Sequence, residues 1–179
     1  MNSHIFSLKP FGGDDSPQNF NITGNITRQD HQLAINYLLG GNLTEIAIAT
    51  PSDTPVRKYN LWEDTCFEFF LAIKNSPQYW EFNLSPAGHW NAFHLDGYRQ
   101  GLQEESVFTK LPFSVQHQSD SLIVALNIDL DKIVPADQTI KVAITTVIKY
   151  INGEVNYWAL THLGAEPDFH LRDSFVLEL

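Results

Sequence analysis

The sequence predicts an all-β protein, an antiparallel β-sandwich of the jelly-roll type with at most short helical turns. Apolar residues alternate with other residues along most of the chain, as expected for strands that bury one face. Short stretches rich in Gly, Pro, Asn, Asp and Ser separate these runs, which is typical of turns between antiparallel strands. About ten short strands with polar turns favour a sandwich or jelly roll.

The alternating runs give the expected strands in chain order: 19–27, 31–39, 44–49, 65–73, 79–85, 90–95, 121–129, 139–150, 156–160 and 173–179. Asn152-Gly153 is a strong signal for a hairpin turn between two of them. The expected helical turns lie in 129–135 and 97–106. The segments 51–60 and 96–110 are expected to be long loops at the rim of the sandwich, where ligands commonly bind.

Length and charge restrict the function. The 179 residues are enough for one domain, residues 1–179, with a substantial core. A formal net charge of −10 and scattered basic residues disfavour binding to nucleic acid or to an anionic membrane surface. No apolar run reaches the roughly 18 residues of a membrane span. The first residues lack the pattern of a secretory signal, so we expect a cytoplasmic protein.

The sequence carries none of the signature motifs of serine hydrolases, zinc proteases, or phosphate- and dinucleotide-binding loops. Its one cysteine, Cys66, excludes an internal disulfide, and its place within an expected strand favours a buried, inert thiol. Asp168 and His170 could share a metal ion, but no third ligand stands at a suitable spacing. The residues therefore predict no metal and no cofactor.

Residues 79–101 are the stretch richest in aromatic and polar side chains. One face of the strand that begins there is apolar and is expected to belong to the core: Trp80, Phe82 and Leu84. Glu81 and Asn83 lie on the opposite face, and a hairpin with the preceding strand would bring Glu68 to the same face. Carboxylate and amide groups side by side can bond the hydroxyls of a sugar. The alternative is a solvated outer face.

Three further residues are candidates for a ligand-facing surface. Trp90 and His94 share one face of the next strand, and a Trp ring stacks well on the C–H face of a sugar. Arg99 lies in a loop between glycines, where it could contact hydroxyls or a carboxylate. The alternatives are a core tryptophan, and for Arg99 a salt bridge to Asp96 or Glu63.

Four segments resemble a known family: "LWEDTCFEFFL" (61–71), "YWEFNLSPAGHWNAF" (79–93), "DGYRQG" (96–101) and "PDFHLRDSFVLEL" (167–179). They are similar to the DOMON-like, type 9 carbohydrate-binding module-like domains that occur as small stand-alone bacterial proteins. Together they cover about a quarter of the chain, and their order and spacing fit across most of it. The resemblance implies a jelly-roll-like sandwich in which a terminal sugar lies between two tryptophan rings.

The resemblance also implies which residues would hold the sugar. The family's D-x-x-x-E-x-F block is matched loosely by residues 64–70, so Glu68 is the acidic residue carried over, and Asn83 takes the polar position on the next strand. Trp62 and Trp90 are the best matches for the two sandwiching rings, since both flank loops. The C-terminal tryptophan of the sugar-binding modules has no match here, where Phe169 and His170 stand instead.

Two cofactors, calcium and haem, are considered only because of the family resemblance. Calcium is implied by the family, with no ligand set of its own in this sequence. The wider DOMON group includes haem-binding domains that use Met and His as axial ligands, but the one methionine is Met1, a poor ligand at the start of the chain. Haem is therefore not expected.

The leading hypothesis is a non-catalytic module that binds a saccharide or similar small polyol through Trp62, Glu68, Glu81, Asn83, Trp90, His94 and Arg99. One alternative is an interaction protein, including a homo-oligomer, that buries an aromatic face between subunits. Another is a sugar-acting enzyme that uses Glu68 and Glu81 as acid and base, which a pocket holding a carboxyl of raised pKa would support.

Overall fold

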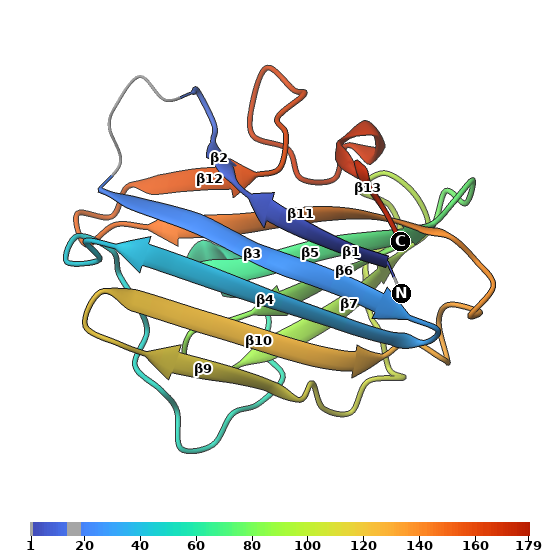
Figure 1. Ribbon diagram of the computed structural model, residues 1–179, viewed down its shortest axis with the longest axis horizontal. Coiled ribbons are helices and arrows are strands. Elements are labelled where there is room, and N and C mark those ends of the chain that lie inside the picture. Colours follow the sequence, from blue (N-terminus) through green and yellow to red (C-terminus); the bar gives the residue numbers. More distant parts are fainter. Residues whose placement is uncertain (1, 14–18) are drawn as a thin grey trace.

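A computed structural model describes residues 2–13 and 19–179 and shows two antiparallel sheets packed face to face (Figure 1). The smaller sheet has the strand order β1 (Asn2–Ser7), β3 (Phe20–Gln29), β4 (Gln32–Gly41), β10 (Ser121–Asp129), β9 (Phe113–His117). Its outer face carries many small and polar side chains together with the exposed Ile5 and Leu38, and its inner face supplies one half of the core.

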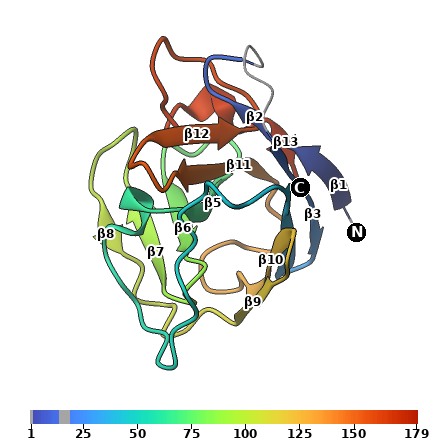
Figure 2. The same ribbon diagram turned by 90° about the vertical axis from the view of Figure 1, so that its left-hand side faces the viewer.

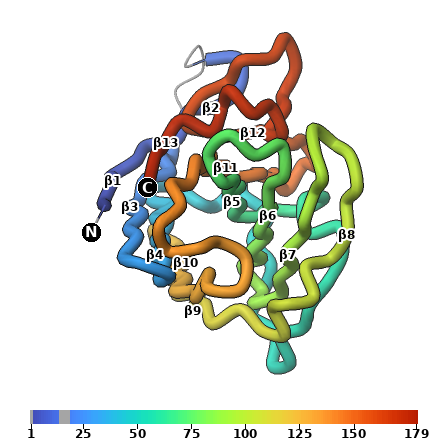
Figure 3. The backbone as a smooth tube through the Cα atoms, turned by 90° about the vertical axis from the view of Figure 1, so that its right-hand side faces the viewer, coloured from blue at the N-terminus to red at the C-terminus, as the bar shows by residue number. Residues whose placement is uncertain are grey.

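The larger sheet has the order β2 (Lys9–Pro10), β12 (Val155–Ala159), β11 (Ile140–Lys149), β5 (Cys66–Ile73), β6 (Tyr79–Leu84), β7 (Trp90–Leu95), β8 (Gln103–Glu104). A last short strand, β13 (Leu177–Glu178), also pairs with β11. Two views along the sheets, Figures 2 and 3, show the two layers side by side, with β1, β3 and β4 in one and β5, β6 and β7 in the other.

The core lies between the sheets and follows the alternation of the sequence. Ile22, Ile26 and Leu33 point inward from β3 and β4, and every second residue of β5 and β6 meets them. Phe69 and Phe82 stack with ring centroids 4.5 Å apart. The expected fold class is confirmed, and so is the placement of the apolar face of β6 in the core.

Helical structure is limited to two short 3-10 turns, η1 (Leu61–Glu63) and η2 (Arg172–Ser174). The expected turn in 129–135 is present as hydrogen-bonded turns after Leu130. The segment 97–106 instead holds a tight turn closed by Gly97 and Gln100, followed by β8. The expected hairpin turn at Asn152-Gly153 is confirmed.

One expected strand is absent. The segment 44–49 makes one isolated bridge, between Ile46 and Tyr150, and no extended ladder. The alternating pattern of 44–49 does reflect burial, since Ile46 is buried. However, the backbone of this segment bonds β11 only at the end of that strand, beyond the residues that pair with β5. A period-two pattern shows which side chains are buried, whereas a strand also needs a neighbouring backbone along its length.

The larger sheet is also buried on its outer face. Phe70, Tyr79 and Phe93 point away from the main core and form a second apolar cluster with Phe175. Three stretches of the chain lie over this face: the segment that ends in η1, the loop 96–102, and the C-terminal segment 160–176. A sheet covered on both faces reads as a continuous apolar run, which explains the sequence of β5.

Candidate functional site

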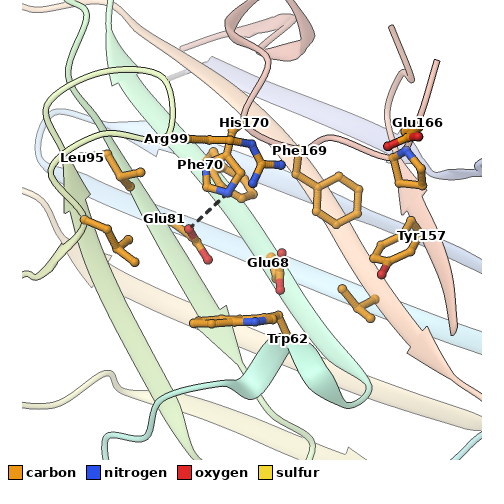
Figure 4. Close-up of a pocket in the computed structure, with 13 residues that line it drawn as sticks. Trp62, Glu68, Phe70, Glu81, Leu95, Arg99, Tyr157, Glu166, Phe169 and His170 are labelled. Carbon is orange, nitrogen blue, oxygen red and sulfur yellow. Dashed lines mark ion pairs between the residues drawn. The ribbon is translucent and has the colours of Figure 1, made fainter. Parts of the chain in front are cut away.

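A cavity of about 610 Å³ opens on the outer face of the larger sheet, between that face and the three covering stretches (Figure 4). Its lining residues come from β5, β6, β7, β11, β12, η1, the loop 96–102 and the C-terminal segment: Trp62, Glu68, Phe70, Glu81, Leu95, Arg99, Leu102, Val147, Tyr157, Glu166, Pro167, Phe169 and His170. Residues far apart in the sequence therefore meet around one space.

The strand register places a row of polar side chains at the base of this cavity. Thr145 of β11 pairs with Glu68 of β5, which pairs with Asn83 of β6. All three are buried, with exposed fractions of 1%, 2% and 0%. Directly opposed residues on one face have Cβ atoms about 5 Å apart, so the three side chains are neighbours.

Each of these side chains has an oxygen without a hydrogen-bond partner in the described part of the chain: Thr145 Oγ1, Glu68 Oε1 and Asn83 Oδ1. Leaving a buried polar group unpaired costs about 1–3 kcal/mol, and native proteins keep few of them. These three atoms are adjacent and fully buried, and Glu68 is the one of the three residues that lines the cavity. The Thr145 hydroxyl and the Cys66 thiol lie close enough to the Glu68 carboxyl to lower its pKa, against the larger effect of burial.

Glu81 lies beside this row and is also buried. Its Oε1 accepts a hydrogen bond of 2.9 Å from Asn83 Nδ2, which orients the amide so that Asn83 Oδ1 stays free. Burial raises the pKa of Glu81 to about 7. Burial, and then the charge of Glu81, raise the pKa of Glu68 well above its usual range.

His170 faces Glu81 from the C-terminal segment, with its Nε2 3.9 Å from Glu81 Oε2 (Figure 4). Its other nitrogen, Nδ1, is 2.8 Å from the hydroxyl of Tyr79. Burial, together with the charge of Arg99, lowers the pKa of His170 to about 4, so the ring is neutral near pH 7. A proton on Nε2, facing the carboxyl, is electrostatically favoured, and Nδ1 then accepts the Tyr79 proton.

Arg99 joins two of the covering stretches. Its Nη2 lies 2.9 Å from Asp168 Oδ1, and Asp168 Oδ2 accepts a hydrogen bond of 2.6 Å from Tyr98. The backbone N–H of Arg99 donates to the Tyr79 hydroxyl at 3.2 Å, with Arg99 at a positive φ of 52°. The ion pair expected for Arg99 therefore exists, but its partner is Asp168 rather than Asp96 or Glu63.

Aromatic side chains form the walls. Trp62 lies on η1 and packs against Phe93 with ring centroids 6.0 Å apart. Phe169 and Tyr157, 5.9 Å apart, stand on the other side of the cavity, and the Glu68 carboxyl points into the space between Trp62 and Phe169 (Figure 4). Flat apolar walls above a polar base suit a ligand with C–H faces and a hydroxylated edge.

The structure brings together five of the seven residues expected at the site. Trp62, Glu68, Glu81 and Arg99 line the cavity, and Asn83 lies at its base. Binding of a ligand by these five residues stays a prediction.

Trp90 and His94 do not face the cavity, and their expected place on the ligand side is corrected. They pair with Leu84 and Trp80, which point into the core, so both belong to the core side of β7. Trp90 is 5% exposed, and the Arg57 guanidinium lies 4.5 Å from the centre of its ring. Trp90 and His94 do share a face, as expected, but alternation does not say which face of a strand is inner.

Several lining residues were not expected from the sequence, among them Tyr157, Phe169 and His170 as parts of one site. The sequence feature that pointed to Phe169 and His170 was the similarity of residues 167–179 to the family named above. Asp168 accepts hydrogen bonds from Arg99 and Tyr98, and His170 Nδ1 lies 2.8 Å from the Tyr79 hydroxyl. Residues 2–13 and 19–179 contain no group of three or more His, Cys, Asp or Glu able to hold a metal ion.

The calcium expectation stays a prediction, and Met1, considered above as a haem ligand, lies outside the described residues. Cys66 is buried beneath the site, as expected for an inert thiol, and burial raises its pKa well above the usual range. None of the helices within the described ranges is long and apolar enough to cross a membrane.

Fold and site together define an antiparallel β-sandwich with an aromatic-walled, polar-based pocket on the outer face of one sheet. No family model matches the sequence, and no curated protein matches it. Among solved structures, the chain is similar to a candidate carbohydrate-binding protein from Bacteroides uniformis ATCC 8492. The TM-score is 0.67 and the identity 16%, over 93% of this chain and 81% of that chain. The two proteins share the fold.

A family 9 carbohydrate-binding module from Caldicellulosiruptor kristjanssonii also matches, in complexes with cellotriose and with glucose. The TM-score is 0.49 and the identity 11% in both cases. The matches cover 82% of this chain and 68% and 69% of those chains. The DOMON part of the resemblance stays a prediction.

Proposed function

We propose that the protein is a non-catalytic module that binds a saccharide or a similar small polyhydroxylated ligand in the cavity on the outer face of the larger sheet. The observation that carries the proposal is the cavity itself, in which the carboxyls of Glu68 and Glu81 lie beside the rings of Trp62 and Phe169. The carboxyls would bond ligand hydroxyls. The shared fold with a candidate carbohydrate-binding protein supports the same reading.

The walls would supply most of the affinity. A sugar ring between Trp62 and Phe169 would bury its C–H faces on aromatic surface, while Glu68 and Glu81 select the geometry of its hydroxyls. The cavity volume of about 610 Å³ lies within the range of small-molecule sites, roughly 300–1,000 Å³. It leaves room for a ligand of one or two sugar rings.

The test is a titration of the protein with neutral mono- and oligosaccharides, followed by tryptophan fluorescence and thermal unfolding. We expect saturable stabilisation by at least one sugar. Glu68→Gln, which keeps the shape of the side chain, should weaken binding at least tenfold, whereas Glu154→Gln on the exposed β11–β12 turn should not. An absence of response to every sugar, on the order of tens of millimolar, would overturn the proposal.

One observation favours a second candidate, an enzyme acting on a sugar. Burial places the pKa of Glu81 at about 7, and that of Glu68 is raised as well, as acid–base catalysis near neutral pH requires. Hydrolysis of aryl glycosides by the wild type, lost in Glu81→Gln, would establish this candidate. Sugar binding without turnover would exclude those substrates.

The alternative of an interaction protein needs an exposed aromatic face on the sandwich that another subunit could cover. Phe70, Tyr79 and Phe93 occupy that face, but segments of the same chain bury them. Oligomerisation itself stays a prediction.

A further inference from the structure

The charges around the cavity are unbalanced. Glu68, Glu81 and Glu166 bring three carboxyls to its lining. On the cationic side, Arg99 is held by Asp168 at 2.9 Å, and His170 is bonded to Tyr79. Across residues 2–13 and 19–179, no lysine or arginine forms an ion pair with Glu68 or Glu81.

The two buried carboxyls are close to one another. Glu68 is directly opposite Asn83, and Glu81 lies two residues before Asn83 on the same face of β6. Glu68 and Glu81 are therefore diagonal neighbours, a relation in which Cβ atoms lie about 7 Å apart. Burial raises the pKa of both carboxyls and outweighs the charge of Arg99, which favours the ionised form of Glu81, and the two carboxylate charges repel each other.

The sheet presents two carboxyls to the cavity, those of Glu68 and Glu81. One N–H of the Asn83 amide already bonds Glu81 Oε1 and holds that carboxyl in place. Ionised carboxyls only accept hydrogen bonds, and a primary ammonium group has three N–H donors and no acceptor, so the two groups are complementary.

The aromatic walls fit the same group. Rings of Trp62, Phe70 and Phe169 line the space into which the Glu68 carboxyl points (Figure 4). A cation near the face of such rings is attracted by the ring quadrupole, whose negative side lies over the face. Carboxylates among aromatic rings make a suitable environment for a positively charged ligand and a poor one for an anion.

We propose that the site selects saccharides that carry a protonated amino group, with Glu68 as the counter-ion of that group and Glu81 as the second carboxyl beside it. The inference rests on the proposed function and specifies its ligand class as amino sugars. Binding of the ammonium group favours the ionised form of Glu68, so complex formation near neutral pH releases a proton from the carboxyl pair to solvent.

The experiment compares matched sugars by titration calorimetry near neutral pH: glucosamine, glucose and N-acetylglucosamine, and the corresponding galactose set. We expect each amino sugar to bind at least tenfold more tightly than its neutral and N-acetylated counterparts. We also expect heats that depend on the buffer and report proton release. Glu68→Gln should remove the preference for the amine, while Glu154→Gln should leave it unchanged.

The outcomes separate the inference from the function on which it rests. Equal affinities for amino and neutral sugars, or a preference that survives in Glu68→Gln, would overturn the inference and leave sugar binding intact. Equally tight binding of the N-acetylated sugar would show that shape rather than charge is selected, and would also overturn it. No binding of any of these sugars would overturn the proposed function as well.

Discussion

Burial moves the pKa values of Glu81 and His170 in opposite directions, to about 7 and about 4, so that both side chains tend toward their neutral forms. The raised pKa of Glu81 stabilises the fold below pH 4.5, the value of an ordinary Glu, and this contribution is lost as the pH rises through about 7. The lowered pKa of His170 acts in the other direction, since stability falls as the pH drops from 6.5 toward about 4.

Glu81→Gln removes one of these two opposed contributions. We expect the variant to gain stability relative to the wild type as the pH rises, by about 2–3 kcal/mol between about pH 4 and about pH 8. Urea unfolding at a series of pH values measures this difference. Glu154→Gln, a change of the same kind on an exposed turn, is the control. A difference between Glu81→Gln and wild type that stays constant with pH would contradict the assignment.

Trp62 and Trp90 are chemically identical and play different structural roles. Trp90 is packed in the main core, so Trp90→Ala should lower the free energy of unfolding by about 3–5 kcal/mol. Trp62 is half-buried at the wall of the cavity, and Trp62→Ala should cost about 1 kcal/mol.

Chemical denaturation gives the two stabilities, and titration with a ligand found for the wild type gives the effect on binding. Trp62→Ala should lower affinity strongly while the fold is retained. Similar losses of stability in both variants would contradict the distinction between a core ring and a wall ring.

At the scale of elements, the site depends on stretches that are not strands. The loop 96–102 and the C-terminal segment 160–176 meet through Asp168, which holds both Arg99 and Tyr98. Loops over a rigid sheet can vary without loss of the fold, which makes them suitable for shaping a pocket.

Asp168→Asn should loosen this connection, because the amide loses the ion pair with Arg99 and one acceptor oxygen. We expect amide hydrogen exchange in 97–101 to become about tenfold faster, while exchange in the core strands stays unchanged. Asp173→Asn, an exposed change in the same segment, is the control. Unchanged exchange in the loop would show that packing alone holds it in place.

At the scale of the whole molecule, the two sheets are joined by more than apolar contact. Tyr37 of β4 is buried, and its hydroxyl donates a hydrogen bond of 2.7 Å across the core to the backbone oxygen of Glu68. The smaller sheet thereby fixes the strand that carries the acidic residue of the site.

Tyr37→Phe removes this bond with little change of shape, and should lower the free energy of unfolding by about 1–2 kcal/mol. If the bond also positions Glu68, ligand affinity should fall in the same variant. Tyr59→Phe, at an exposed residue, is the control, and thermal and urea unfolding measure both. A Tyr37→Phe protein as stable as the wild type would mean that the bond contributes nothing beyond packing.

The sequence by itself determined the fold class and most strands, because period-two alternation directly records which side chains are buried. It also determined that Glu68, Glu81 and Asn83 share a face. Alternate residues of one strand lie on the same face, and pairing in a hairpin aligns the faces of its two strands. It could not determine which face of β7 is inner, and Trp90 and His94 were therefore placed on the ligand side.

The tertiary structure decided where the pocket lies and what closes it. His170 and Phe169 meet Glu81 and Glu68 in one cavity only through the path of the C-terminal segment across the sheet, and Tyr157 does so through the pairing of β12 with β11. Loop paths depend on a few long-range contacts, such as that of Arg99 with Asp168, which leave no periodic signal in the sequence. Local alternation thus specifies strands and their faces, whereas a site assembled from distant segments exists only once those segments are packed together.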